Sequence, residues 1–268
     1  MAGPATNPVT KAATKPVVIT RPLAQAGSLA QQVRAMGRDA IVFPLLEIHP
    51  LSDPLPLQAA LEDLTAYAMV AFVSPNAIDA ASSVLGIWPQ EVMLAVMGEG
   101  SRAALAQHGV TAANATIVSP HDPHRTDSET LLAAMDLDSL KGRQVLIVRG
   151  ESGRELLGDA LRAAGAQVTQ VAAYRRAAPA MDEARRTQLR VLLDSSNDWI
   201  VTSSEALRIL MQMVRQVGDD AGVAKMQQQR MIVPHARIEE TAQMLGFHDI
   251  TLTGSGDERL LAALQSRT

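Results

Sequence analysis

Several residue types are scarce or missing in this chain of 268 residues, and each absence narrows its function. There is no cysteine, which excludes disulfides, thiolate metal sites and cysteine nucleophiles. Aromatic residues make up only 3% of the chain, so its cores must use aliphatic side chains and the 12 methionines. Such cores are typical of parallel sheets that helices cover on both faces.

Long apolar runs and an excess of positive charge are missing too. No apolar run reaches the length of a membrane span, and the N-terminal residues lack the apolar core of a secretory signal. We therefore expect a cytoplasmic protein that does not bind membranes, with a disordered lead over residues 1–15. The net charge of −4 argues against a general nucleic-acid binder but leaves room for a locally positive cleft.

Residues 145–176 have the pattern of a strand, a polar turn, a helix and a second strand. An apolar run at 145–148 precedes a turn at 149–154 that is rich in glycine and charge. Leucines and alanines then recur at helical spacing, and Gly165 stands where a left-handed residue would end the helix. This order predicts a βαβ unit.

A second copy of this unit lies near the N-terminus, with its helix predicted over residues 28–36. Arg21 and Arg149 end the first strand of each copy, and Gly37 and Gly165 end each helix, at a common offset of 128 residues. Weaker matches continue downstream, with Ser74 and Ser203 at an offset of 129 residues and the later segments at looser spacing. We predict an α/β fold of two pseudo-repeated domains with parallel sheets, because the period is too long for a solenoid.

Two short motifs suggest a nucleotide or a metal, and a plainer interpretation fits each better. Residues 98–103 match G-x-G-x-x-A, but they are not on the first strand-to-helix turn of their domain, and no acidic residue ends the next strand. His121 and His124 lie beside Asp122, yet no third ligand is near. We predict a tight turn and a solvated loop, and no metal site.

Polar side chains gather at the predicted carboxyl ends of the parallel strands. They are Arg21, Ser74, Ser101, Arg149, Thr202, Ser203 and Ser204. Open α/β sheets bind ligands at this edge, where helix N-termini present free N–H groups to anions. Any single hydroxyl could merely cap a helix, but the set across both halves predicts a pocket for an anionic ligand, since arginine suits carboxylate and phosphate.

Tyr174 is one of two tyrosines and follows a predicted strand in a segment that crosses between the halves. A phenol at an interdomain cleft can act as an acid or as a hydrogen-bond donor. A packing aromatic in the hinge is equally consistent with the sequence, so both interpretations stay open.

Taken together in their order and spacing, seven segments resemble uroporphyrinogen-III synthase. They are ITRP (19–22), FVSPNAI (72–78), MGEGSRAAL (97–105), VRGESGRELL (148–157), VAAYRR (171–176), VTSSEAL (201–207) and VPHARIEETA (233–242). The resemblance spans residue 16 to the C-terminus. It implies one domain from residues 16–45 and 178–268, another from 51–171, and a two-stranded antiparallel linker of residues 45–51 and 171–177.

The resemblance also implies an activity and a site. The family closes the linear tetrapyrrole hydroxymethylbilane into uroporphyrinogen III, with inversion of ring D and loss of water, and uses no metal or organic cofactor. By resemblance the active site is the interdomain cleft, and Tyr174 assists loss of the substrate hydroxyl. The strand-end residues, with Ser101 at a family cleft position and with Asn76 and Arg154, are then candidates for binding the substrate carboxylates.

One loop departs from the family pattern. Where many members carry Gly-Pro-x-Thr, this chain has VPHAR at residues 233–237, so the loop lacks a hydroxyl. Its role would pass to backbone N–H groups, to His235 or to Arg237.

A binding protein is the alternative to an enzyme. It would be a two-domain module that captures a small polyanion by hinge closure without chemistry. Such modules are usually exported, so the missing signal peptide counts against it. For the enzyme we also expect a monomer that acts on a small-molecule substrate.

Overall fold

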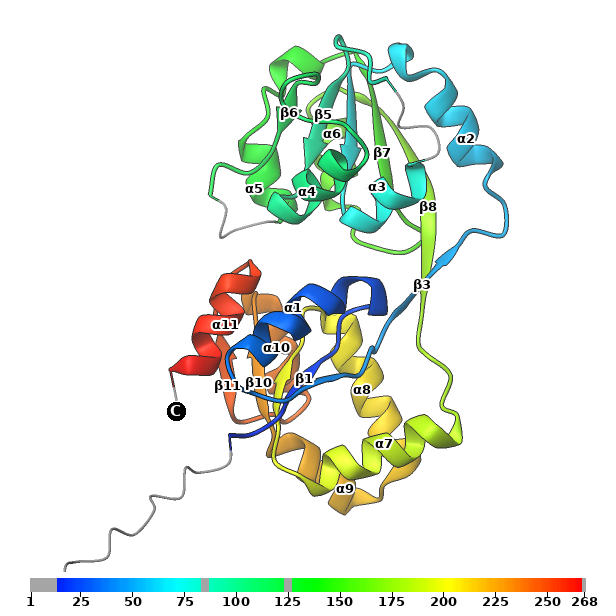
Figure 1. Ribbon diagram of the computed structural model, residues 1–268. Helices are drawn as coiled ribbons and strands as arrows, with labels where there is room; N and C mark the ends of the chain where they lie inside the picture. Colours follow the sequence, from blue (N-terminus) through cyan, green and yellow to red (C-terminus); the bar gives the residue numbers. More distant parts are fainter. Residues whose placement is uncertain (1–13, 83–86, 123–126, 267–268) are drawn as a thin grey trace, which may run out of the picture.

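Two sheets organise the chain, each in its own α/β domain (Figure 1). The computed structural model describes residues 14–82, 87–122 and 127–266. The five-stranded sheet has the order β11-β10-β9-β1-β2, and its paired strands are parallel. The six-stranded sheet has the order β3-β8-β7-β4-β5-β6 and is parallel except for the β3 and β8 pair. The prediction of two α/β domains with parallel sheets is confirmed.

The strands have the following bounds. The five-stranded sheet contains β1 (Val17–Ile19), β2 (Ala40–Val42), β9 (Asp198–Ile200), β10 (Arg230–Val233) and β11 (Ile250–Leu252). The six-stranded sheet contains β3 (Glu47–Pro50), β4 (Met69–Phe72), β5 (Met93–Val96), β6 (Ile117–Val118), β7 (Gln144–Gly150) and β8 (Gln167–Ala177).

The two sheets share one strand order once strands are matched by the sequence repeat. At the offset of 128 residues β1, β2 and β4 match β7, β8 and β9, and β5 and β6 match β10 and β11 by their order along the chain, at longer offsets. The order β2-β1-β9-β10-β11 then corresponds to β8-β7-β4-β5-β6. Apart from β3, each sheet therefore combines two strands from one half of the chain with three from the other, which is the pseudo-repeat that the sequence predicts.

Helices cover both faces of each sheet, because strand residues alternate between the faces. In the five-stranded domain one face carries α1 (Leu23–Ala35) and α11 (Asp257–Gln265), and the other carries α7 (Glu183–Asp194), α8 (Ser204–Val217), α9 (Asp220–Gln227) and α10 (Ala236–Met244). In the six-stranded domain α2 (Leu55–Glu62), α3 (Pro75–Ala81) and α4 (Glu99–Gln107) oppose α5 (Ser128–Ala133) and α6 (Leu156–Ala163).

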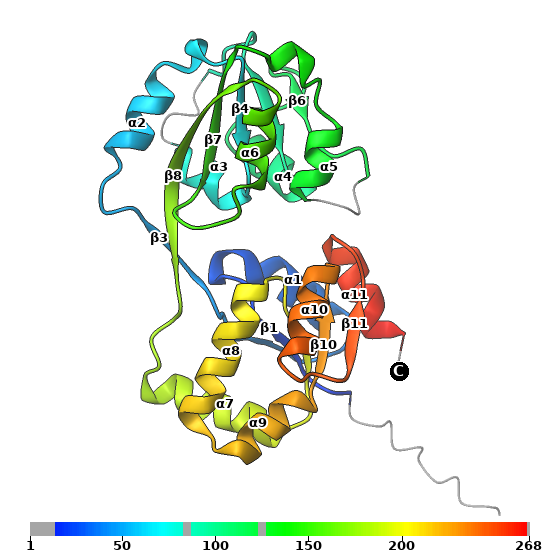
Figure 2. The ribbon, with the colours of Figure 1, turned by 180° about the vertical axis from the view of Figure 1, so that it is seen from behind.

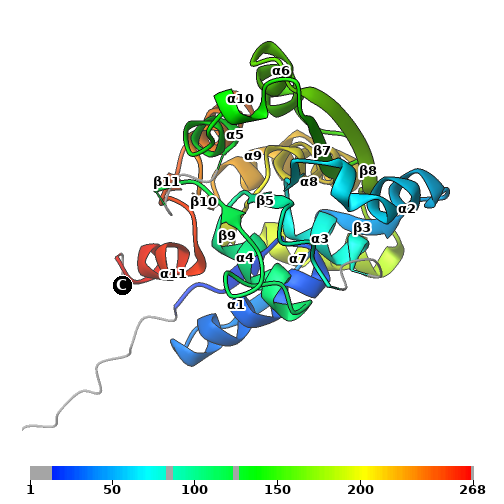
Figure 3. The same ribbon diagram turned by 90° about the horizontal axis from the view of Figure 1, so that it is seen from above.

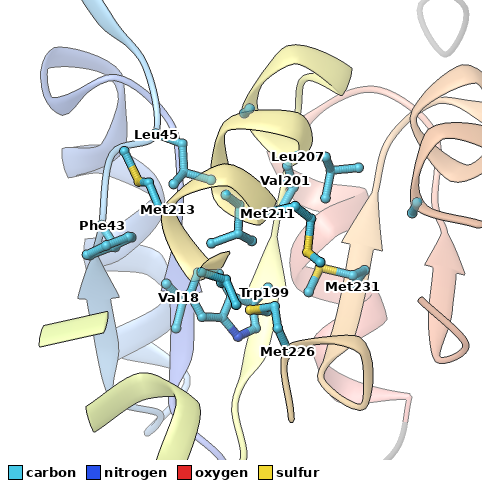
Figure 4. Packing of buried hydrophobic residues seen from close by; sticks show 14 of the residues in the cluster. Val18, Phe43, Leu45, Trp199, Val201, Leu207, Met211, Met213, Met226 and Met231 are labelled. Atoms are coloured by element: carbon cyan, nitrogen blue, oxygen red, sulfur yellow. The ribbon is translucent and has the colours of Figure 1, made fainter. Parts of the chain in front are cut away.

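The cores have the composition that the sequence predicts. Val18 faces the α7 to α10 side of its sheet, whereas Val17 and Ile19 face α1 and α11. On the first side Trp199 is fully buried and belongs to one cluster with Met226 and Met231 (Figure 4). Methionine suits such a core because its unbranched chain fills irregular space between helices.

The linker is a strand pair in which β8 belongs to both the sheet and the crossing. β3 runs antiparallel to the end of β8, from the Glu47 and Ala177 pair to the Pro50 and Tyr174 pair. β8 continues without a break into the six-stranded sheet, where it pairs with β7 (Figure 2). Seen from above, α2, β3 and β8 lie at one edge of the molecule (Figure 3). Tyr174 thus stands where β8 leaves the sheet.

The sequence misplaced or missed some helices. The first helix begins at Leu23 and not at residue 28, because Pro22 precedes it as a natural start and Gly27 is tolerated inside it. Helix α9 was not predicted, since its apolar positions are few; the Asp219 side chain caps it. The sequence also predicts a helix over residues 77–85, and the part of it from residue 83 lies outside the described residues, as do residues 1–13 of the predicted lead. Within the described chain, no helix is long and apolar enough to cross a membrane.

Candidate active site

A pocket of about 840 Å³ opens between the two domains. The six-stranded domain lines it with the residues that follow or end β4 and β7, including Ser74 and Gly150. The five-stranded domain lines it with the segments after β10 and β11, including His235 and Thr253. Both walls therefore consist of the carboxyl ends of parallel strands, where open α/β sheets bind their ligands.

The two domains use different parts of that edge. In the six-stranded sheet the strand order reverses between β7 and β4, and both of these strand ends line the pocket. In the five-stranded sheet the corresponding reversal lies between β1 and β9, where Arg21 and Ser203 stand outside the lining. The repeat is thus symmetric in its strands but asymmetric in its site.

Tyr174 belongs both to the core of the six-stranded domain and to the lining of the pocket. It is 5% exposed. Its oxygen lies 3.1 Å from the hydroxyl oxygen of Ser74. Ser74 is also the N-cap of α3, since its hydroxyl oxygen accepts a 3.2 Å hydrogen bond from the Ala77 N–H. Both sequence interpretations of Tyr174, packing and an accessible phenol, therefore describe the same side chain.

Arg149 is held in a closed ring of hydrogen bonds. Its guanidinium donates to Glu155 Oε1 at 2.6 Å and to Gln170 Oε1 at 2.7 Å, and Gln170 Nε2 donates to Glu155 Oε2 at 2.8 Å. The hydrogen bonds from Gln170 and Arg149 hold the pKa of the Glu155 carboxyl below its usual value. Arg149 is 9% exposed, and a Cβ at Gly153 would lie 2.7 Å from its Nη2. The network therefore presents a fixed guanidinium to one wall of the pocket.

The other arginines of the pocket are more exposed than Arg149 and come from both sides of it. Arg154 belongs to the six-stranded domain, Arg176 to β8 and Arg237 to α10 of the five-stranded domain. Arg154 contacts Glu129 at 3.2 Å, and Arg176 forms an ion pair with Glu205 of α8 at 3.2 Å. Burial lowers the pKa of the Arg237 guanidinium, and the positive charge of Arg154 lowers it further, followed by the charges of Arg208 and Arg176. Cations from both domains are thus close enough to repel one another, which makes this end of the pocket suitable for anions.

The N-terminus of α10 adds uncharged donors to the same wall. His235 is its N-cap residue but makes no capping hydrogen bond with its side chain, so no side chain caps the N–H groups of Ala236 and Arg237, which point an uncharged donor pair at this wall. The Ile238 N–H donates to the His235 carbonyl at 2.9 Å. Burial lowers the pKa of the His235 ring, and the charge of Arg237 lowers it further, while Asp127 raises it. The ring is therefore neutral near pH 7 and can accept as well as donate a hydrogen bond.

The structure brings half of the candidate site residues to this pocket. Its lining includes Tyr174, Ser74, Arg149, Arg154, His235 and Arg237. The other candidates lie outside the lining, namely Arg21, Asn76, Ser101, Thr202, Ser203 and Ser204. For all of them contact with substrate stays a prediction.

Most of the candidates outside the lining have partners elsewhere in the described chain. Arg21 forms a 2.7 Å ion pair with Asp257, and Asn76 accepts a 2.7 Å hydrogen bond from Gln25. Ser203 caps α8 by accepting from the Ala206 N–H. Ser101 and Ser204 are buried, at 3% and 7% exposed, and the Ser204 hydroxyl donates to the Arg237 carbonyl of α10 at 3.4 Å.

Sequence reasoning missed several residues of the lining. Thr253 is the most informative, because its hydroxyl oxygen lies 3.5 Å from the Val233 carbonyl oxygen, beside the loop that departs from the family pattern, and donates to the Gly254 carbonyl at 2.9 Å. A neighbouring strand end thus places a hydroxyl next to the loop that lacks one. Thr253 follows a predicted strand, so the strand-end rule could have found it. Arg176 and Gln170 had no such signal, since they lie within β8.

The two histidine candidates for a metal do not form a site in the described chain. Among residues 14–82, 87–122 and 127–266, no group of three or more histidine, aspartate or glutamate side chains is arranged to hold a metal. His121 lies in the described part of its loop, and His124 lies outside it.

The fold and this pocket define a two-domain α/β protein with a pocket between its domains that is lined by arginines from both sides. The family model described as uroporphyrinogen-III synthase HemD matches residues 27–253. Uroporphyrinogen-III synthase of Escherichia coli (strain K12) is 33% identical over 257 residues, which cover 93% of this chain and 99% of that relative. The enzyme of Salmonella typhimurium is 33% identical over 254 residues, with coverages of 93% and 99%. The chain belongs to the uroporphyrinogen-III synthase family.

Solved structures agree on the fold. Uroporphyrinogen-III synthetase from Helicobacter pylori 26695 gives a TM-score of 0.59 at 15% identity, covering 95% of this chain and 100% of that one. A mutant uroporphyrinogen III synthase from the extremely thermophilic bacterium Thermus thermophilus gives a TM-score of 0.57 at 11% identity, covering 93% and 97%.

Proposed function

We propose that this chain closes hydroxymethylbilane into uroporphyrinogen III, with inversion of ring D and loss of water, as a cyclizing lyase of heme biosynthesis. Membership of the family supports the reaction. The observation that carries the proposal at the site is the Tyr174 phenol, which reaches an interdomain pocket lined by arginines from both domains.

The substrate carries acetate and propionate side chains, so its carboxylates need several donors at once. Arg154 and Arg237 supply guanidinium groups from opposite walls, and the α10 N-terminus supplies N–H groups. Arg149 adds a guanidinium that its network holds in place. These contacts would curl the linear chain so that its two ends meet.

Tyr174 then acts as the acid. Its phenol gives a proton to the terminal hydroxyl, the C–O bond breaks, and water leaves an azafulvene cation that the pyrrole nitrogen stabilises. The substituted α-carbon of ring D attacks this cation and forms a spiro intermediate. The old bridge bond breaks and forms again at the free α-carbon of ring D, which loses its proton; the phenolate takes a proton back.

The pocket must also favour the inverted product. Without the enzyme the same substrate closes to the non-inverted type I isomer, so the protein has to hold ring D with its substituted carbon facing the cation. Positioning and stabilisation of the developing positive charge would supply much of the rate enhancement.

The working unit in this proposal is a monomer, because a single chain supplies both walls of the pocket. The cytoplasmic location and the absence of a metal or organic cofactor stay predictions. Full activity after dialysis against a chelator would support the absence of a metal.

The test is to give the purified chain freshly made hydroxymethylbilane and to separate the product isomers. We expect the type III isomer in excess over the spontaneous type I isomer. If only the type I isomer appears, the chain does not catalyse the inverting closure, and a binding module becomes the better interpretation.

A further inference from the structure

We infer that Ser74 is a positioning residue that donates a hydrogen bond to the Tyr174 phenol oxygen, so that the phenol's own proton faces the pocket. The inference rests on the proposed function, in which Tyr174 is the acid. It gives Ser74 a different role from direct binding of a substrate carboxylate.

The hydrogen bonds of Ser74 favour this direction. A serine hydroxyl has one proton and two lone pairs. The Ala77 N–H occupies one lone pair at 3.2 Å, and the Tyr174 oxygen lies 3.1 Å away. Within the described chain Tyr174 is the neighbour that can accept the Ser74 proton, so donation from serine to phenol satisfies the serine hydroxyl. The Tyr174 proton is then free to reach a substrate.

The surroundings of the ring keep the phenol in this position. A Cβ at Gly150 would lie 3.0 Å from Cζ and 3.2 Å from the phenol oxygen of Tyr174, so the glycine backbone already packs closely against the ring. The ring itself is in the core with Phe72 and Val148. Ser74 is fixed in turn by capping α3. The phenol oxygen therefore has a defined place at the pocket wall.

Donation from Ser74 to the phenol oxygen also favours transfer of the Tyr174 proton to the substrate. When the phenol gives up its proton, the negative oxygen keeps the hydrogen bond from Ser74, and hydrogen bonds to a charged oxygen are stronger than those to a neutral one. The interaction thus becomes stronger as the proton leaves, which is the property that lowers a barrier.

The sequence repeat separates this role from helix capping. Ser203, at the matching place in the five-stranded domain, caps α8 by accepting from the Ala206 N–H at 3.4 Å. The residue that matches Tyr174 at the offset of 128 is Leu46, which is buried and apolar. Capping is therefore common to both domains, and the hydrogen bond to a phenol is particular to Ser74.

A double-mutant cycle tests the inference. We expect Ser74→Ala to lower kcat about 3- to 10-fold with KM nearly unchanged, which corresponds to one lost hydrogen bond. In a Tyr174→Phe background the same substitution should change kcat by less than about twofold, because the partner is already gone. If Ser74→Ala lowers kcat equally in both backgrounds, or raises KM alone, Ser74 does not act through the phenol.

Three further variants separate orientation from stability. Ser74→Thr keeps the hydroxyl and should retain most of kcat. Ser74→Asp keeps the cap but accepts the phenol proton, so kcat should fall although the helix remains capped. Asp219→Ala removes the cap of α9 outside the pocket and should lower the melting temperature without changing kcat. A normal kcat for Ser74→Asp would overturn the inference.

A measurement without substrate separates this inference from the proposed function. The chain has only two tyrosines, so ¹³C labelling at tyrosine Cζ gives two resonances, and Tyr67→Phe identifies that of Tyr174. Ser74→Ala should shift the Tyr174 resonance, whereas Asp219→Ala should not. An unshifted resonance would refute the hydrogen bond even in an active enzyme, and a shift would support it whatever product isomer forms.

Discussion

Gln25 in α1 donates a 2.7 Å hydrogen bond from Nε2 to Oδ1 of Asn76 in α3, and this contact joins the two domains outside the pocket lining. The Arg176 and Glu205 ion pair is a second contact, between the linker and the five-stranded domain. Both contacts are small, so we expect the domains to rock about β3 and β8 when substrate binds.

Removal of the hydrogen bond between Gln25 and Asn76 should open the domains. One hydrogen bond contributes about 1 kcal/mol. Gln25→Ala should therefore shift the resting population towards open forms, raise the radius of gyration in small-angle scattering and raise KM about 2- to 5-fold. Gln32→Ala is the matched control, since Gln32 lies on the same helix and bonds to Ser28 of that helix. Identical scattering curves for Gln25→Ala and the parent would show that the hydrogen bond between Gln25 and Asn76 does not hold the domains together.

Removal of the Tyr174 hydroxyl should slow the reaction without abolishing it. A general acid typically contributes ~100-fold or more. We expect Tyr174→Phe to lower kcat by only about 10-fold, because the hydroxyl leaves readily and water can supply a proton. The product should remain the type III isomer, since the ring keeps its packing. Tyr67→Phe, outside the pocket lining, is the control. A Tyr174→Phe enzyme with the parent kcat and isomer ratio would deny the phenol any chemical part.

The exposed arginines should affect binding and not folding. We expect Arg154→Ala and Arg237→Ala each to raise KM about 5- to 20-fold, as charge-assisted hydrogen bonds to carboxylates are lost. Their melting temperatures should stay within about 2 °C of the parent, because exposed ion pairs add little stability. Added salt should weaken substrate binding less in these variants than in the parent. Arg162→Ala on α6 is the control, since Arg162 bonds to Asp159 outside the lining. An unchanged KM in both variants would exclude them from the site.

Stability should depend on the charge of Glu155 in a predictable direction. Its pKa is lowered in the folded protein, chiefly by the hydrogen bond from Gln170 and then by that from Arg149. The carboxylate therefore stabilises the fold above the unfolded pKa, and this contribution is lost as the pH falls through the folded pKa. Glu155→Gln should melt below the parent at pH 7, and the difference should shrink below about pH 4. A difference that stays constant down to about pH 3 would contradict the network.

Arg149 and Arg154 show what the sequence could not distinguish. Both lie in one polar turn, and the pattern suggests the same carboxylate-binding role for each. In the structure Gln170 and Glu155 hold Arg149, whereas Arg154 keeps a largely exposed guanidinium beside Glu129. The difference arises because Gln170 comes from β8, whose side-chain direction depends on the pairing with β7.

Ser74 and Ser203 make the same point about hydroxyls. Sequence alone predicts that each caps a helix at a strand end, and both do so. Ser74 lines the pocket and Ser203 does not. β8 also brings the phenol of Tyr174, 100 residues further along the chain, next to the Ser74 hydroxyl. The strand-end rule could have listed Thr253 as a candidate, but its nearness to the Val233 loop depends on the pairing of β10 with β11.

The sequence by itself determined the element types, the aliphatic and methionine-rich cores, the internal repeat and the family resemblance, because these depend on local periodicity and on residue order. The tertiary structure alone decided which strand ends share a pocket. Each domain takes strands from both halves, so residues such as Gln25 and Asn76, or Ser74 and Tyr174, become neighbours only after that exchange. Hydrophobic periodicity specifies which face of a strand is buried, but it carries no information on which domain the strand joins.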